Sequence, residues 1–141
     1  MTVVLGISNS HNGSVALIRD GRVLSAIQAE RLSRNKREAL IIGKNTKLLR
    51  DCINYCLEVG KVDQSEINSV GISTPWRATE INDDDLFEFI GACPNNYLGT
   101  FYVPHHLAHS EYIVHYGDND PGLVLVIDGS GTMEEDRKLF K

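Results

Sequence analysis

A two-residue Asp-Gly link constrains the fold of this chain more than any other sequence feature. Asp20-Gly21 joins β-rich segments at 14–19 and 22–28, and such a link is the strongest short-range signal of a β-hairpin. A third β-rich segment, 3–8, precedes them. The loop 9–13, between the segments 3–8 and 14–19, carries polar side chains and a glycine, which lets the backbone approach a ligand closely. The sequence therefore predicts three strands in quick succession at the amino terminus.

Helical and strand patterns alternate through the rest of the chain. Apolar residues at helical spacing predict a helix that Asn45 or Thr46 caps and that Gly60 ends in the left-handed conformation. Asp83 to Asp85 favour the start of a helix over a cation site, because consecutive helical side chains point in different directions. The other expected elements are a strand at 69–73, a helix after Asn82, a strand at 100–103, a helix from 105 to about 116, and a strand at 123–127 buried on both faces.

The resulting order, βββαβαβα with one more strand, is that of a ribonuclease-H-like α/β unit followed by the first strand of another. In the actin-like ATPase superfamily, which the order resembles, two such units face each other across a nucleotide cleft. This resemblance implies that most of the second unit is missing from the 141 residues. We expect an amino-terminal lobe at 1–120, and at 121–141 the first strand and phosphate-type turn of a truncated second lobe.

Composition narrows the classes of function. A chain of 141 residues can form one domain with a real core, and its net charge of -5 argues against a nucleic-acid partner. No apolar run approaches the roughly 20 residues that span a bilayer, and the start lacks a signal peptide. We therefore expect a cytoplasmic protein that binds no membrane. Cys52 and Cys56, among apolar neighbours, indicate buried thiols.

The histidines carry the clearest chemical signal. His105 and His109 are four residues apart, a spacing that places two imidazoles on one helical face, and Pro104 suits the first turn of that helix. His106 would point elsewhere and could meet a phosphate or orient a ligand. The spacing is common, so packed or solvated histidines are an alternative. Imidazole ligands alone would suit zinc, iron, copper or nickel.

A glycine-rich turn follows the last expected strand. Gly129 and Gly131 let backbone N–H groups turn toward an oxyanion, and Asp128 at the carboxyl end of a strand can hold a metal or a metal-bound water. A plain Asp-Gly turn is equally consistent. Because one helix separates this turn from the histidines, Asp128 could approach His105 and His109 and complete a mixed nitrogen and oxygen site with open positions.

Two further segments carry candidate groups. His11, in the loop 9–13, could act as a general base near neutral pH and take a proton from an acceptor hydroxyl, although a plain surface histidine is the simpler interpretation. The basic stretch from Arg31 to Arg37 could hold phosphate oxygens, which arginine binds through its bidentate fork. Such a stretch is also typical of a solvated loop.

Together these segments resemble the O-carbamoyltransferases of the nodulation and antibiotic-modifying type. The family commonly has Asp where Asn12 stands, and its chain continues well beyond position 141. The resemblance is carried by five motifs in order, Leu5-Gly6-Ile7, His11-Asn12-Gly13 with Asp20-Gly21, Glu30-Arg31-Leu32-Ser33-Arg34, His105-His106-Leu107-Ala108-His109 and Ile127-Asp128-Gly129-Ser130-Gly131.

The resemblance implies transfer of a carbamoyl group from carbamoyl phosphate, with ATP and through a carbamoyl-adenylate, to a hydroxyl of a small molecule. His105 and His109 would bind a divalent metal, usually Fe(II), with Asp128 close by, and His11 would be the base. The implied partners are the small-molecule acceptor and a missing carboxyl-terminal lobe or separate chain, and a homodimer could also form. The expected contacts to ATP or carbamoyl phosphate are Glu30, Arg31, Arg34, Lys36, His106, Gly129 and Gly131.

Two alternatives share the expected fold. The chain could be a non-catalytic half that binds metal or nucleotide weakly, or that needs a separately encoded carboxyl-terminal partner. A sugar-kinase-like ATPase would have the fold without the histidine pair. An actin-like cleft needs both lobes, so we expect the isolated chain to be catalytically incomplete.

Overall fold

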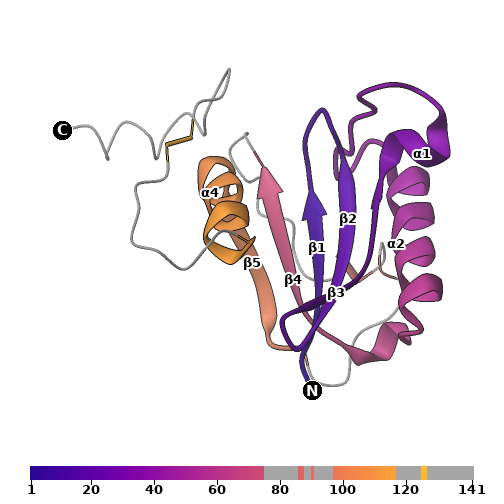
Figure 1. Ribbon diagram of the computed structural model, residues 1–141. Helices are drawn as coiled ribbons and strands as arrows, with labels where there is room; N and C mark the ends of the chain where they lie inside the picture. Colours follow the sequence, from indigo (N-terminus) through magenta and orange to yellow (C-terminus); the bar gives the residue numbers. More distant parts are fainter. Residues whose placement is uncertain (75–85, 88–89, 91–96, 117–124, 127–141) are drawn as a thin grey trace.

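The computed structural model describes residues 1–74, 86–87, 90, 97–116 and 125–126. Within them a five-stranded mixed sheet has the order β3-β2-β1-β4-β5. Helix α2 lies on one side of the sheet and α4 on the other (Figure 1). The elements are β1 Val3–Ser8, β2 Ser14–Arg19, β3 Arg22–Gln28, α1 Ala29–Ser33, α2 Thr46–Gly60, the 3₁₀ helix η1 Gln64–Glu66, β4 Ile67–Thr74, β5 Gly99–Pro104 and α4 His105–Tyr116.

The two amino-terminal hairpins confirm the prediction, including the bounds of all three strands. Asp20 and Gly21 have φ values of 48° and 79°, the positive pair that a tight hairpin turn of the primed type requires. Strand β2 pairs antiparallel with both β1 and β3. The Asp-Gly link therefore pairs Arg19 with Arg22 and Ile18 with Val23, after which the register of β2 with β3 shifts by one residue.

Strands β4 and β5 run parallel to β1, and both are longer than the sequence predicted. Ser8 of β1 pairs with Ser73 of β4, and Ser73 pairs with Val103 of β5. The carboxyl ends of these three strands therefore lie along one edge of the sheet, the carboxyl edge, which is uppermost in Figure 1. The loop after β1 and the first residue of α4 both leave from this edge.

The hydrophobic core lies between the sheet and α2. Alternate residues of β1 and β2 point into it, as a half-buried pleated sheet requires, and α2 presents the apolar face that its helical spacing predicted. Leu86 and Ile90, in the region of the second expected helix, are buried in the same cluster. The largest fully buried side chains are Leu5, Leu17, Leu40, Leu49, Ile53, Ile67, Ile72, Leu86, Ile90, Val3, Val15 and Val70.

Both ends of α2 differ from the expectation. Asn45 precedes the helix, but its side chain makes no capping bond; instead it accepts from the Ile41 amide and donates to the Ala39 carbonyl. The left-handed residue is Lys61, with φ of 51°, and not Gly60. A Cβ at Gly60 would lie 2.9 Å from Leu17 Cδ2, so this glycine allows the helix to pack closely on β2.

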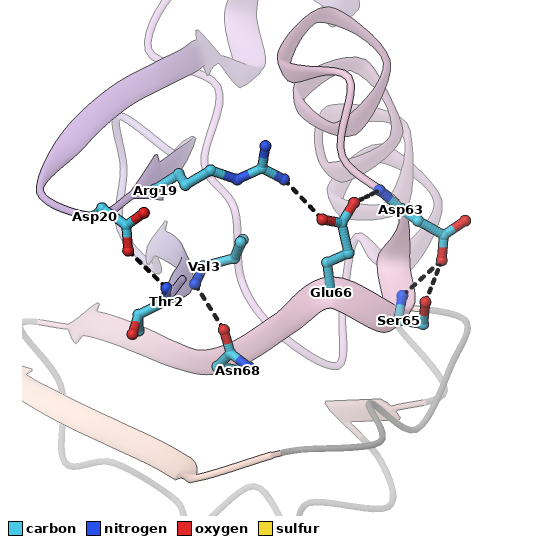
Figure 2. Close-up of polar contacts among 8 residues, drawn as sticks. All are labelled: Thr2, Val3, Arg19, Asp20, Asp63, Ser65, Glu66 and Asn68. Atoms are coloured by element: carbon cyan, nitrogen blue, oxygen red, sulfur yellow. Dashed lines mark hydrogen bonds and ion pairs between the residues drawn. The ribbon is translucent and has the colours of Figure 1, made fainter.

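The edge opposite the carboxyl edge is held by polar contacts (Figure 2). Glu66 accepts from the Asp63 amide through one carboxylate oxygen and from the Arg19 guanidinium through the other, at 2.8 and 2.9 Å. Asn68 Oδ1 accepts from the Val3 amide at 2.7 Å, where the pairing of β1 with β4 shifts register. These contacts fix the start of β1 and serve stability.

Three features of the described chain depart from the expected order, and the 3₁₀ helix η1 is one of them. Helix α1 was not predicted, because five residues are too few for a periodic pattern. Residues 125–126 belong to no strand, and the Leu125 side chain is 74% exposed, so the prediction of a strand buried on both faces is wrong for these two residues. A strand is buried only when neighbouring strands and helices cover it, and 125–126 pair with neither β3 nor β5.

Several expectations lie outside the described residues. They are the start of the helix expected after Asn82, with Asp83 to Asp85, the remaining residues of the last expected strand, and the Asp128 to Gly131 turn. None of the helices that the structure describes combines the length and the apolar character that crossing a membrane requires.

Candidate active site

The carboxyl edge brings together two of the segments that the sequence singled out. The β1–β2 loop, residues 9–13, leaves the edge after β1, and His105 follows β5 directly. Strand β4 lies between β1 and β5, and neighbouring strands are about 4.8 Å apart, so the two departure points are about 10 Å from each other. In open sheets with parallel strands, ligands bind outside the carboxyl ends of the strands.

The predicted metal ligands meet on the first turns of α4. The Nε2 atoms of His105 and His109 are 3.3 Å apart, and the two ring centroids are 4.6 Å apart with the ring planes near perpendicular. The His106 ring centroid lies 6.0 Å from that of His105, with the two ring planes tilted by 41°, and the His106 Nε2 atom is buried. The structure thus confirms that His105 and His109 share one face of the helix.

The spacing of this pair fits a metal ion. Two imidazole nitrogens bound to one metal at about 2.0–2.1 Å in tetrahedral geometry lie about 3.3 Å apart, the separation seen between the His105 and His109 Nε2 atoms. Among the described residues no group of three His, Cys, Asp or Glu side chains gathers around one point. The pair therefore presents two imidazole nitrogens close together, and Asp128, the expected third ligand, lies outside the described residues.

The His11 side chain lies at the exposed tip of the β1–β2 loop, while the rest of the loop is anchored. The Leu40 amide donates to the Ser10 carbonyl and the Gly13 amide donates to the Glu38 carbonyl, both at 3.0 Å. A Cβ at Gly13 would lie 2.3 Å from the Leu40 backbone nitrogen. This glycine is therefore needed for packing against residue 40, and the prediction that it admits a ligand to the backbone is wrong.

The basic stretch forms α1 and the turn after it. Glu30 serves this local structure, because its carboxylate accepts from the Arg37 amide at 3.0 Å and its carbonyl accepts from the Arg34 amide. Arg34 closes the helix with a φ of 65°. Arg31, Arg34 and Lys36 are exposed, and an exposed guanidinium or ammonium can reach an anion without first losing a buried partner.

A wide groove of about 1430 Å³ connects the histidine helix with this basic stretch. His109 and Arg31 are both among the residues that line it. Ser14 and Gln28, cross-strand neighbours on β2 and β3, add polar groups that the sequence analysis missed; their only signal was their position at strand ends beside the loop 9–13. The groove is lined by Ser14, Val15, Ala16, Ala26, Ile27, Gln28, Arg31, Leu32, Tyr55, Ala108, His109, Leu125 and Val126.

The predicted site residues are thus partly assembled. His109 and Arg31 share the groove, and His105 joins His109 on α4. The residues of the groove do not include His11, Arg34 or Lys36. Gly129 and Gly131, like Asp128, lie outside the described residues.

The sheet order and the flanking helices place the chain in the class of ribonuclease-H-like, actin-like ATPase folds. Two solved structures share this arrangement: YeaZ from Pseudomonas aeruginosa, with a TM-score of 0.50 and 13% identity, and an uncharacterized protein with similarity to peptidase YEAZ from Pseudomonas aeruginosa, with a TM-score of 0.52 and 14% identity. The matches cover 82% and 83% of this chain and 50% of each of the other chains. At this identity they establish the fold alone.

Within this class the chain belongs to the carbamoyltransferase N-terminus family, whose sequence model matches residues 3–86. This confirms the family resemblance. The match includes the three amino-terminal strands, the His11 loop and the basic stretch. It ends before α4, so the histidine pair lies beyond the matched residues.

Three curated proteins are similar over most of the chain. An uncharacterized protein of Methanocaldococcus jannaschii is 33% identical over 129 residues, which are 92% of this chain and 22% of that protein. Nodulation protein NolNO of Sinorhizobium fredii is 28% identical over 145 residues, covering 86% and 20%. Nodulation protein U of Rhizobium tropici is 29% identical over 137 residues, covering 96% and 20%. The chain therefore spans about a fifth of the length of these relatives.

Proposed function

We propose that this chain is the amino-terminal part of an ATP-linked O-carbamoyltransferase, which transfers the carbamoyl group of carbamoyl phosphate, through a carbamoyl-adenylate, to a hydroxyl of a small molecule. Membership of the carbamoyltransferase N-terminus family supports the transferase class. The observation that carries the site is the 3.3 Å pair of His105 and His109 at the same edge of the sheet as His11.

In the proposed transfer step the acceptor oxygen bonds to the carbamoyl carbon. His11 takes the hydroxyl proton as general base, a role that needs an exposed imidazole able to reach a bound acceptor. The bond between the carbamoyl carbon and the phosphate oxygen breaks, and AMP leaves with that electron pair. Arg31, in the groove with His109, would bind the phosphate oxygens through its bidentate guanidinium.

We assign His105 and His109 as ligands of a divalent metal, Fe(II) by family resemblance. The donor set fits, because neutral imidazole binds iron, zinc, copper and nickel. A metal held there would supply positive charge that polarises the phosphate and carbonyl oxygens of the mixed anhydride. The residues of this chain would orient that anhydride between α4 and the basic stretch.

The test is ATP-dependent transfer of a labelled carbamoyl group. The natural protein that carries this sequence would be given ATP, carbamoyl phosphate labelled at its carbon, and a mixture of small hydroxyl compounds. We expect label in a hydroxyl compound together with AMP, and a loss of about 10²- to 10⁴-fold in His11→Ala, the scale of general-base catalysis. Asn54→Ala, an exposed change on α2, is the matched control with full transfer.

Two results would count against the proposed function. Label could remain in carbamoyl phosphate whatever the acceptor, or His11→Ala could transfer as fast as the unmodified protein. The isolated 141-residue chain is expected to be inactive in the same assay, because one lobe cannot enclose the nucleotide. Full activity of that chain would overturn this expectation.

A further inference from the structure

A short segment after the basic stretch runs beside the β1–β2 loop. We call residues 38–42 the strap. Its backbone contacts both ends of the loop, since the Leu40 amide donates to the Ser10 carbonyl and the Gly13 amide donates to the Glu38 carbonyl. The Leu40 side chain is fully buried. The strap therefore belongs to the folded core.

Asn9 connects this strap to the sheet. Its backbone amide donates to the Ser73 carbonyl at 2.8 Å, which extends the pairing of β1 with β4 one residue past the end of β1. Its side-chain Oδ1 accepts from the Ile42 amide at 3.0 Å, and its Nδ2 donates to Thr74 Oγ1 at 3.4 Å. One side chain thus joins the loop, the strap and the end of β4.

The remainder of the loop is also fixed, apart from its tip. Ser10 is buried, and its hydroxyl lies 3.1 Å from that of Ser8. At the other end the Gly13 carbonyl accepts from the Ala29 amide at 2.8 Å. Only His11 and Asn12 between them are exposed. The backbone on either side of His11 is therefore held, while its ring faces solvent at the carboxyl edge.

We propose that Asn9 is a positioning residue, which locks the β1–β2 loop to the strap and to β4 so that His11 is held in place at the carboxyl edge. The inference rests on the proposed role of His11 as the base. A base must lie within hydrogen-bond reach of the proton that it takes, and a shift of about 1 Å can cost much of the rate. The side-chain amide of Asn9 supplies both an acceptor and a donor, and alanine supplies neither.

Amide hydrogen exchange and the His11 ring signal of the purified chain test this positioning role. Asn9→Ala removes the acceptor of the Ile42 amide, so exchange there and at Leu40 should become at least about tenfold faster, as expected of local opening. The His11 ring resonance should shift or broaden. Amides of α2 should keep their protection, which shows that the variant is folded.

Two further variants make the test specific. Asn9→Asp keeps an oxygen for the Ile42 amide and can accept from the Thr74 hydroxyl, so it should restore protection and the His11 signal. Asn54→Ala should change neither. Unprotected Leu40 and Ile42 amides in the unmodified chain would overturn the proposal. Unchanged amide exchange in the strap together with an unchanged His11 ring resonance in Asn9→Ala would also overturn it.

The same variants separate this proposal from the proposed function. In the transfer assay Asn9→Ala should lower kcat about tenfold with little change in KM for carbamoyl phosphate. If His11→Ala keeps full transfer, the assigned function of His11 fails while the exchange result stands. If His11→Ala abolishes transfer but Asn9→Ala leaves exchange and kcat unchanged, the function stands and the positioning role fails.

Discussion

At the scale of single residues, the sequence predicted the geometry that depends on helical spacing. It did not predict the geometry that depends on tertiary packing. His105 and His109 share a face because four residues make about one helical turn, and their Nε2 atoms do lie 3.3 Å apart. Gly13 was expected to admit a ligand, but it is buried against Leu40. Nothing in the sequence near position 13 shows that position 40 packs there.

The Gly13 contact leads to a prediction about stability. Gly13→Ala should lower the free energy of unfolding by about 2–3 kcal/mol, because the added Cβ overpacks against the backbone of residue 40. Gly60→Ala is a suitable comparison, because its added Cβ would lie 2.9 Å from Leu17 Cδ2, a side-chain atom and not backbone, and this contact should cost less. Urea denaturation of the two variants would measure the difference, and equal midpoints would refute the assigned role of Gly13.

At the scale of elements, local signals predicted the strands and the main helices. The Asp-Gly turn and the alternating pattern defined three strands to the residue, and helical spacing defined α2 and α4. Helix α1 and the strap carry no periodic pattern in the sequence. Contacts with the β1–β2 loop hold both segments in place, and local signals do not predict such contacts. Asn45 looked like a cap, yet its side chain stabilises the turn before α2 instead, a competition common for asparagine.

Helix α2 also carries a pH dependence. Burial, with smaller contributions from Cys56 and Asp51, raises the pKa of the Cys52 thiol from 9.0 to about 11. The unfolded chain then loses this proton first, so the associated stability is fully present below pH 9 and is lost as pH rises toward 11. Urea midpoints across this window should fall more steeply for the unmodified chain than for Cys52→Ala. Parallel slopes would contradict the assignment.

At the scale of the whole molecule, the two edges of the sheet have different roles. The edge at Glu66 and Asn68 is held by contacts that fix the start of β1 (Figure 2). The carboxyl edge gathers the His11 loop and the histidine pair, because β1, β4 and β5 are parallel. The order of elements predicted this arrangement. The third metal ligand was predicted at Asp128, and no described residue tests it.

The measurement that tests the central claim most directly is Fe(II) binding by the purified chain. Binding would be measured by anaerobic equilibrium dialysis and elemental analysis. The proteins compared are the unmodified chain, His105→Ala and His109→Ala, with His106→Ala as the control. We predict that each ligand variant weakens binding by more than about tenfold, since loss of an outer-shell partner alone costs 10- to 100-fold, and that the control retains iron. Equal iron content in all four proteins would contradict the assignment of the histidine pair.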